Sequence, residues 1–319
     1  MNVKQLTNEA VDVTDWLRDE EFAEYPEGAR DKTLLYCPNP SPYSFLKAGH
    51  RYLFKRSSPR YSEQFWVEIF AYQLGTRMGI PVPATFVAYD SKKEQSGALI
   101  EWFLNQIGSF SQEVLIPGGD YCQQYIPNFD RKKGKQHNFE TVAQIFGDLS
   151  KKHAGFSEDW KTYWAKTFIF DALIGNTDRH QDNWGIIENP PTGEMRISPV
   201  FDNGTSMGHE ISPTKFDSYT DASQLEKYLN RGWHHMKWKL SDTAQAGHIE
   251  LLKKFINKYP ETRQLMVTCL KMVNYETLKT ILDNLVEFDV PVRLSKERAN
   301  FMLELLNFRY QRLLNELQS

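Results

Sequence analysis

The chain has 319 residues, which at roughly 150 residues per domain indicates about two domains or one two-lobed unit. Hydrophobic residues make up 40% of the chain and aromatic residues 13%, which is enough to bury a large core and excludes a mostly disordered protein. The 38 Lys and Arg residues against 41 Asp and Glu residues give a formal net charge of −3, which argues against a general binder of nucleic acid or anionic membranes.

The cysteines and the apolar runs bear on the compartment. Cys37, Cys122 and Cys269 are too few and too scattered for a disulfide framework or a zinc motif, and they fit a reducing compartment. The N-terminus is mixed and polar, unlike a signal peptide, and the longest apolar runs fall far short of the ~20 residues that a membrane span needs. We therefore expect no membrane span and a cytoplasmic protein, with secretion left open.

The first part of the chain predicts a small sheet with one helix. Residues 1–30 are acidic, with helix-like and turn-like pieces, and we treat them as an N-terminal extension. From 62 to 79 apolar residues recur at spacings of three and four and end at Gly79, which predicts an amphipathic helix. We expect an N-lobe over 31–104, whose predicted strands are 33–36, 51–56, 85–89 and 98–103.

The second part is mostly helical. We interpret 105–138 as a linker or mobile segment and 139–319 as a helical C-lobe, with helices at 140–149, 160–173, 248–257, 275–286 and 296–317. Two extended pieces, 184–187 and 195–198, flank the turn NPPTGE and predict a hairpin. The expected fold is α+β and bilobal, and the cleft between two lobes is a usual place for a ligand site.

The densest polar cluster follows the helix 160–173. Its sequence is GNTDRHQDNWGII, in which Asp178 and Asn183 are five residues apart, and Asp202 lies in ISPVFDNGTS after the second hairpin strand. Phosphoryl transfer needs one carboxylate to orient or deprotonate the attacking hydroxyl, and an Asn and an Asp to bind Mg²⁺. Either fragment alone also fits an ordinary turn. Together, astride one hairpin, they favour a metal–nucleotide site.

A lysine and a glutamate upstream extend this pattern. Lys55 lies in the predicted strand RYLFKR, where alternation turns it to the face of Leu53, and a lysine on an apolar face needs a partner. Glu68 lies on the next helix, so a strand Lys could pair with a helix Glu, as in the phosphate clamp of kinases. A snorkelling Lys and a solvated Glu are the alternative for either residue alone.

These segments resemble the HipA-like kinase family and, within it, the smaller CtkA-like members. The likeness rests on LIGNTDRHQDNWGII and ISPVFDNGTS, with YLFKR and FWVEIFAYQLG followed by IPVP in support, and it covers most of the chain from about residue 28. The first motif is also similar to that of phosphatidylinositol 3/4-kinases. The resemblance implies a bilobal protein-kinase-like fold, use of ATP and Mg²⁺, and phosphorylation of Ser or Thr.

The resemblance also implies roles for individual residues. Asp178 would be the catalytic Asp, and Asn183 and Asp202 the Mg²⁺ ligands. Lys55 would contact the α- and β-phosphates with Glu68 as its partner. The hinge that meets the adenine would be Glu101, Trp102 and Phe103. His180 would assist proton transfer or touch the γ-phosphate, as in lipid kinases, and capping of backbone groups is an equal alternative.

The chain departs from typical protein kinases in its loops. The H-R-D order is absent, Asp202-Asn203-Gly204 replaces D-F-G, and no G-x-G-x-x-G precedes Lys55. Residues 41–49 are therefore expected to cover the phosphates, with Ser44 among the contacts. HipA-type kinases autophosphorylate in this loop, which makes Ser41 and Ser44 candidate sites.

We thus expect an ATP-dependent Ser/Thr protein kinase of HipA-like type. A lipid or small-molecule kinase and a nucleotide-binding pseudokinase are the alternatives. The expected partner is a protein substrate, with an antitoxin or another regulator as a second, and no direct nucleic-acid contact. The basic run at 131–135 fits either an acidic partner or a solvated loop, and His234-His235 fits aromatic packing better than a metal site.

Overall fold

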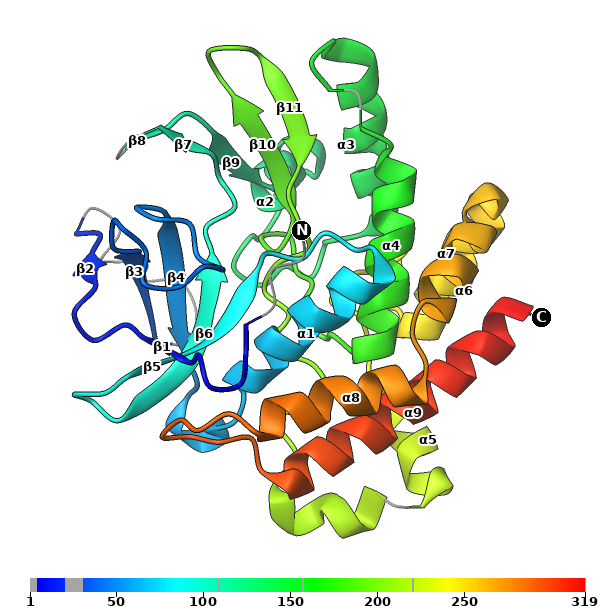
Figure 1. Ribbon diagram of the computed structural model, residues 1–319. Coiled ribbons are helices and arrows are strands. Elements are labelled where there is room, and N and C mark those ends of the chain that lie inside the picture. Colours follow the sequence, from blue (N-terminus) through cyan, green and yellow to red (C-terminus); the bar gives the residue numbers. More distant parts are fainter. Residues whose placement is uncertain (1–4, 21–30, 108–109, 157, 220, 319) are drawn as a thin grey trace.

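The computed structural model describes residues 5–20, 31–107, 110–156, 158–219 and 221–318. A sheet-rich lobe formed by the first third of the chain lies beside a lobe of helices, which confirms the expected α+β, two-lobed architecture (Figure 1). The N-lobe sheet has the strand order β1-β5-β6-β4-β3-β2. Its strands are β1 (Val11–Asp12), β2 (Leu17–Arg18), β3 (Lys32–Tyr36), β4 (Arg51–Arg56), β5 (Thr85–Asp90) and β6 (Gln95–Glu101).

Strand β4 lies inside this sheet, with β6 on one side and β3 on the other, both antiparallel. Because side chains alternate along a strand, Tyr52 and Phe54 point to one face, where they join an apolar cluster, and Lys55 points to the other. Helix α1 (Phe65–Met78) packs against β5 and β6 and ends at Gly79, which adopts the left-handed conformation (φ 66°). The predicted helix 62–79 is thus confirmed, and it covers the face that carries Lys55.

The N-terminal residues contribute strands rather than a helix. Val11 pairs in parallel with Ala88 of β5, and β2 pairs with β3. Val11, Val13 and Trp16 are buried in the cluster on the outer face of the sheet. Burial of these apolar side chains completes this face of the sheet. It therefore decides the local structure, although the polar composition suggested helix-like and turn-like pieces. Residues 21–30 lie outside the described residues.

The segment expected as a linker is also structured. It contains β7 (Gln106–Ile107), β8 (Phe110–Ser111), β9 (Val114–Pro117) and α2 (Gly118–Tyr125). Strand β9 pairs with β10 (Gly185–Asn189), which in turn pairs with β11 (Glu194–Ile197) in the expected hairpin. The partner of β9 lies about 70 residues later in the chain, so local pattern alone could not reveal this strand.

The C-lobe is helical, and its centre is α4. The helices are α3 (Phe139–Lys152), α4 (Trp160–Ile174), α5 (Ala222–Arg231), α6 (His248–Lys258), α7 (Arg263–Lys271), α8 (Tyr275–Val286) and α9 (Lys296–Gln318), with 3₁₀ turns at Pro59–Tyr61, Pro213–Tyr219 and Pro260–Thr262. The Asp159 side chain caps the start of α4. The helix ends at Gly175 (φ 68°), where a Cβ atom would lie 2.6 Å from the Arg309 guanidinium. Gly175 therefore lets the chain turn directly from a buried helix into the polar cluster.

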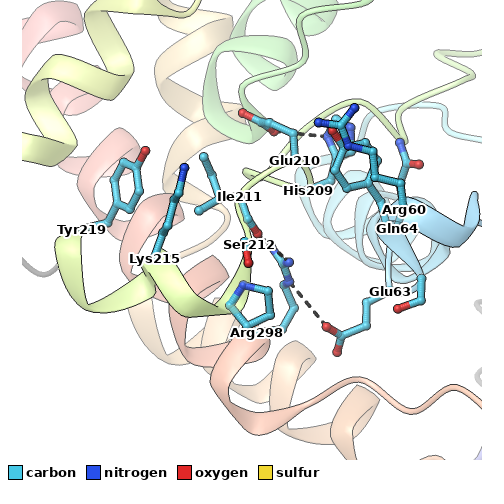
Figure 2. A pocket seen from close by; sticks show the side chains of 13 residues that line it. Arg60, Glu63, Gln64, His209, Glu210, Ile211, Ser212, Lys215, Tyr219 and Arg298 are labelled. Carbon is cyan, nitrogen blue, oxygen red and sulfur yellow. Dashed lines mark hydrogen bonds and ion pairs between the residues drawn. The ribbon is translucent and has the colours of Figure 1, made fainter.

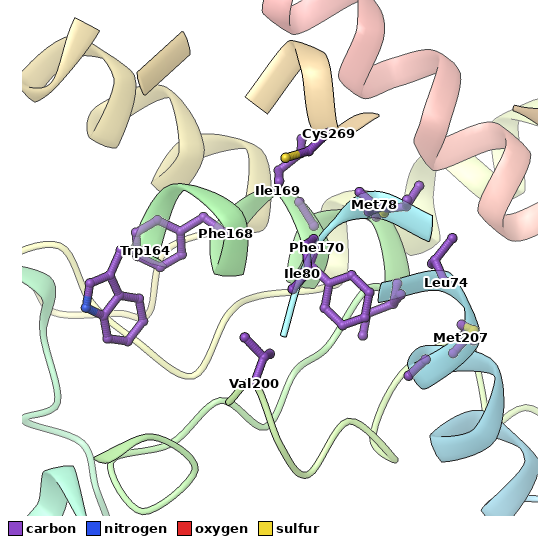
Figure 3. Packing of buried hydrophobic residues seen from close by; sticks show 14 of the residues in the cluster. Leu74, Met78, Ile80, Trp164, Phe168, Ile169, Phe170, Val200, Met207 and Cys269 are labelled. Atoms are coloured by element: carbon purple, nitrogen blue, oxygen red, sulfur yellow. The ribbon is translucent and has the colours of Figure 1, made fainter. Parts of the chain in front are cut away.

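The two lobes share one apolar core. Leu74 and Met78 of α1 and Ile80 lie around Phe170 of α4 in Figure 3, and these four residues and Val200 belong to one buried cluster. This packing sets the position of α1 relative to the helices of the C-lobe. Within the described residues, no helix combines the length and apolarity that a membrane crossing requires.

The junction of β9 and α2 gives a stability test. A Cβ atom on Gly118 would lie 2.1 Å from the ring of Trp184, which is fully buried. We expect Gly118→Ala to lower the free energy of unfolding by about 1–3 kcal/mol, because the ring has no space to move into. Gly147→Ala is the control: it lies within α3 with open space around it, and we expect a gain of about 0.5–1 kcal/mol. Urea unfolding measures both. Equal changes in the free energy of unfolding for the two variants would contradict the close packing of Gly118 against Trp184.

Candidate active site

Lys55 lies between two carboxylates at the junction of the lobes. Its Nζ atom is 2.7 Å from Oε1 of Glu68 on α1 and 2.6 Å from Oδ1 of Asp202, which follows β11. Lys55 is 6% exposed and Glu68 4%, whereas the Asp202 side chain is one-third exposed. The structure therefore brings together the three charged residues predicted from β4, α1 and the segment after the hairpin.

Helix α1 also holds the backbone of the Asp202 segment. The second carboxylate oxygen of Glu68 accepts a hydrogen bond of 3.0 Å from the amide of Asn203. Gln64, one turn earlier, donates to the carbonyl of Gly204 at 2.8 Å. Asp202 itself has a left-handed backbone (φ 54°), which an aspartate tolerates better than most residues. The turn that presents its carboxylate is thus fastened to the N-lobe helix.

The loop that carries Asp178 is held from both sides. Asn176 accepts a hydrogen bond from the Asp178 amide at 3.0 Å and donates to Asp171 in the last turn of α4. The side-chain amide of Asn183 donates to the Asp178 carbonyl at 2.6 Å. Because its nitrogen is used in this bond, the oxygen of the Asn183 amide is the atom that remains for a metal ion. The Asp178 side chain is half-buried.

A buried ion pair supports this loop. Arg179 and Asp171 are both fully buried, and their side chains meet at 2.9–3.0 Å through two hydrogen bonds. Nε2 of His234 contacts the same carboxylate at 3.1 Å. Burial raises the pKa of Asp171, but the charge of Arg179 and the bonds from His234 and Arg179 outweigh burial and lower it. The carboxylate is therefore ionised in the folded protein.

Arg179 also joins the two loops that carry the candidate catalytic residues. Its guanidinium donates to the carbonyls of Asn183 and Phe201 and, at 2.7 Å, to the side-chain oxygen of Asn203. The sequence indicated only a structural Arg179 and did not identify its partner Asp171. An aspartate within the apolar helix WAKTFIFDALIG was the signal for a buried charge.

The expected hinge lies beside the Asp202 segment. The Phe103 ring packs on Phe201, the residue before Asp202, with 5.3 Å between ring centroids, and it stacks on Trp102. The main-chain groups of the hinge form hydrogen bonds. The amide of Glu101 donates to the carbonyl of Ala84, and the amide of Trp102 donates to the carbonyl of Arg51. The carbonyl of Trp102 contacts the His50 ring, and the carbonyl of Phe103 accepts from Arg196. The Glu101 carboxylate forms an ion pair with Lys47.

Ser44 is not brought to this site. The connection 37–50 enters β4 at Arg51, four residues and therefore about 13 Å from Lys55 along the strand. Phe45 of this connection is buried in the cluster on the opposite face of the sheet from Lys55. Ser44 is exposed there, and the Ser41 hydroxyl donates to the neighbouring main chain.

The register of β3 gives the physical reason. Lys32, the first residue of β3, pairs with Lys55, so the connection between β2 and β3 meets the sheet at the Lys55 end. The expectation of a phosphate-covering loop at 41–49 used proximity in sequence, whereas the antiparallel register puts that loop at the other end of the strand. Residues 21–30 of the β2–β3 connection lie outside the described residues.

Five histidines form a cluster that begins at His180, in the loop that carries Asp178. His180 accepts a hydrogen bond from the Asp182 amide, and its ring lies 5.7 Å from His235; His137, His234 and His248 continue the cluster. Burial is the main cause that lowers the pKa of His137 well below its usual value, that of His235 to about 4 and that of His248 to about 3. His234 packs edge-on against Phe168, but it is fully buried rather than partly exposed, and it also contacts the Asp171 carboxylate, which aromatic packing alone did not predict.

A separate cavity of about 430 Å³ lies beyond the Asp202 segment. It is lined by residues 60–64, which precede α1, by residues between 209 and 219, and by Arg298 of α9 (Figure 2). Arg298 donates to the carbonyls of Gly208 and Ile211 and lies 3.7 Å from Glu63. The lining contains none of the residues predicted to bind the nucleotide or the metal, so this cavity is distinct from the candidate active site.

The buried ion pair predicts a large and asymmetric loss of stability. Arg179→Met leaves the Asp171 carboxylate buried without its counter-charge, and we expect a loss of about 3–5 kcal/mol in urea unfolding. Adding Asp171→Asn removes that charge, so the double variant should be more stable than the single one. Arg312→Met removes the ion pairs of a partly exposed arginine with Glu226 and Glu316 and should change stability by less than about 1 kcal/mol. A double variant no better than Arg179→Met would refute the buried-charge explanation.

The histidine cluster predicts acid sensitivity. The pKa values of His137, His235 and His248 are lowered in the folded protein. In the unfolded chain these histidines bind protons below about pH 6.5, whereas in the folded protein they bind them only at about pH 4 or lower. The free energy of unfolding should therefore fall as pH decreases through this window. His248→Asn should reduce the proton uptake on unfolding at pH 5.5 by about one. Urea titrations at several pH values measure the slope, and an unchanged slope would contradict the prediction.

Comparisons with known proteins identify the family and the fold of the chain. The family model of the HipA-like C-terminal domain matches residues 26–263. The serine/threonine-protein kinase CtkA of Helicobacter pylori is 32% identical over 112 residues, which are 32% of this chain and 34% of that protein, so the match spans about a third of the relative.

Solved structures support the fold. The crystal structure of the H. pylori proinflammatory kinase CtkA matches with a TM-score of 0.74 and 18% identity, over 97% of this chain and 96% of that one. HipA of Shewanella oneidensis, solved with HipB and operator DNA, matches with a TM-score of 0.55 and 14% identity, over 95% and 69%. The resemblance seen in the motifs is confirmed: the chain belongs to the HipA-like C-terminal domain family.

Proposed function

We propose that this protein is a Ser/Thr protein kinase that transfers the γ-phosphate of ATP with the help of Mg²⁺. The observation that carries the proposal is the position of the Lys55 ammonium between Glu68 and Asp202. A strand lysine, a helix glutamate and a metal-binding aspartate are the parts of the kinase phosphate site. The kinase named among the relatives supports the same activity.

The donor set fits a magnesium–nucleotide complex. Asn183 and Asp202 offer hard oxygen atoms, which Mg²⁺ prefers, and Mg²⁺ in such sites completes its shell with phosphate oxygens and water. Within the described ranges, no group of three His, Cys, Asp or Glu side chains could hold a metal ion. The bound ion would neutralise charge on the phosphates. Asn183 and Asp202 would hold it.

The residues of the chain then divide the remaining work. Lys55 would bind the α- and β-phosphates, and Glu68 would keep the ammonium in place while Asp202 turns to the metal. Asp178 would orient the acceptor hydroxyl and accept its proton. The transition state of phosphoryl transfer is loose, so this positioning and charge compensation account for most of the catalysis. Glu101, Trp102 and Phe103 would bind the adenine, and His180 would assist near the γ-phosphate.

A protein acceptor is the partner that this function requires. The matched HipA is in complex with HipB and operator DNA, and for this chain an antitoxin or other regulator stays a prediction. The test of the function is incubation of the purified protein with Mg²⁺ and γ-labelled ATP, followed by intact mass measurement and phosphosite mapping. Mapping reads Ser41 and Ser44 directly. Tight nucleotide binding without any turnover would favour a pseudokinase.

Two single variants test the assigned roles. Asp178→Ala and Asp202→Ala should each abolish phosphate transfer, because one removes the group that receives the proton and the other a metal ligand. Only Asp202→Ala should also weaken the binding of Mg-ATP, which isothermal titration calorimetry measures. Asp283→Ala, on the exposed face of α8, is the control and should retain wild-type activity. Full activity in either active-site variant would refute the proposal.

A further inference from the structure

The basic run at 131–135 is a loop with a defined hydrogen-bonded structure. Its chain turns at Gly134, whose amide donates to the Asp130 carbonyl at 2.8 Å, and the Asp130 carboxylate accepts from the Lys133 amide. Gly134 has a left-handed backbone (φ 60°), and a Cβ atom there would lie 2.5 Å from the side-chain oxygen of Gln181. A solvated, featureless loop would not need such a fit.

The loop is fastened to the segment that follows Asp178. Gln181 donates to the Arg131 carbonyl at 2.7 Å, and Arg131 forms two hydrogen bonds to one oxygen of Asp182. Arg131 also pairs with Asp120 at the start of α2. Burial of Arg131 is outweighed by these two carboxylates, so its pKa is raised. Three hydrogen bonds therefore join the basic loop to the segment after Asp178, and the ion pair with Asp120 joins it to α2.

The anchoring leaves two positive charges at the surface. Arg131 is compensated by two carboxylates and Lys133 by Asp130 at 3.2 Å. Lys132 and Lys135 are exposed, and in the described part of the chain neither has an ion-pair partner. The four basic residues of the loop and the three carboxylates that pair with them carry a net charge of +1, and the ammonium groups of Lys132 and Lys135 are the two without a carboxylate partner among the described residues, in a chain whose net charge is −3.

We propose that Lys132 and Lys135 form a docking surface for an acceptor polypeptide that carries Asp or Glu beside the hydroxyl to be phosphorylated. This inference rests on the proposed kinase function and names its substrate class. Charges beside a reaction site attract and orient partners of opposite sign. Nucleic acid fits less well, because the loop offers two uncompensated charges and its sequence DRKKGK has no aromatic residue for base stacking.

Binding of labelled peptides to the full chain tests this surface. The probes are fluorescein-labelled peptides of equal length with a central Ser flanked by Asp and Glu, by Ala and Gly, or by Lys and Arg. A labelled single-stranded RNA is the fourth probe. Fluorescence anisotropy compares wild type, Lys132→Gln/Lys135→Gln, and the control Lys151→Gln/Lys152→Gln, which removes the same charge from the exposed end of α3.

We expect the acidic peptide to bind most tightly and more weakly at higher salt. The loop variant should bind it roughly fivefold to twentyfold more weakly and the control variant within about twofold. Carbodiimide cross-linking should join the acidic peptide to Lys132 or Lys135. Equal binding of acidic and neutral peptides, equal loss in both variants, or a loss confined to RNA would overturn the proposal. Since the readout is binding, failure of phosphate transfer in the labelled-ATP experiment is a separate result.

Discussion

The buried ion pair between Arg179 and Asp171 is the interaction on which the site depends. Two charges removed from water are tolerated only when nearly every donor and acceptor of both groups is engaged. Arg179 meets this demand with carbonyls and a side-chain amide from the two loops, and Asp171 meets it with His234 and Asn176. Leaving either charge buried without its partners would cost free energy, and this keeps the two loops in one arrangement.

This arrangement is continuous with the N-lobe. Asn203 accepts from Arg179 through its side chain and donates to Glu68 through its amide, so a single residue relates the buried ion pair to α1. Glu68 in turn holds Lys55 on β4. The apolar core that α1 shares with α4 supports the same geometry (Figure 3). The polar site thus lies where hydrophobic packing holds the two lobes together.

Much of the fold and of the site could be predicted from local pattern. Helix α1 follows from apolar periodicity and Gly79, and Lys55 was expected to need a partner because alternation turned it to an apolar face. Glu68 and Asp202 were predicted from their residue types and positions. The prediction failed where pairing is distant: β9 needs β10, and the end of β4 that a loop meets depends on strand register.

The sequence by itself determined the main helices, the central strands of the N-lobe and the chemistry at their ends, because helix periodicity, strand alternation and the need of a charge for a counter-charge are local properties. Only the tertiary structure decided which distant groups meet. Burial and register decide that Asp171 pairs with Arg179, that the loop with Ser44 meets β4 at the end away from Lys55, and that the basic loop lies beside Gln181. Burial and register are set by the whole chain, since each depends on the segments that pack against the residue in question.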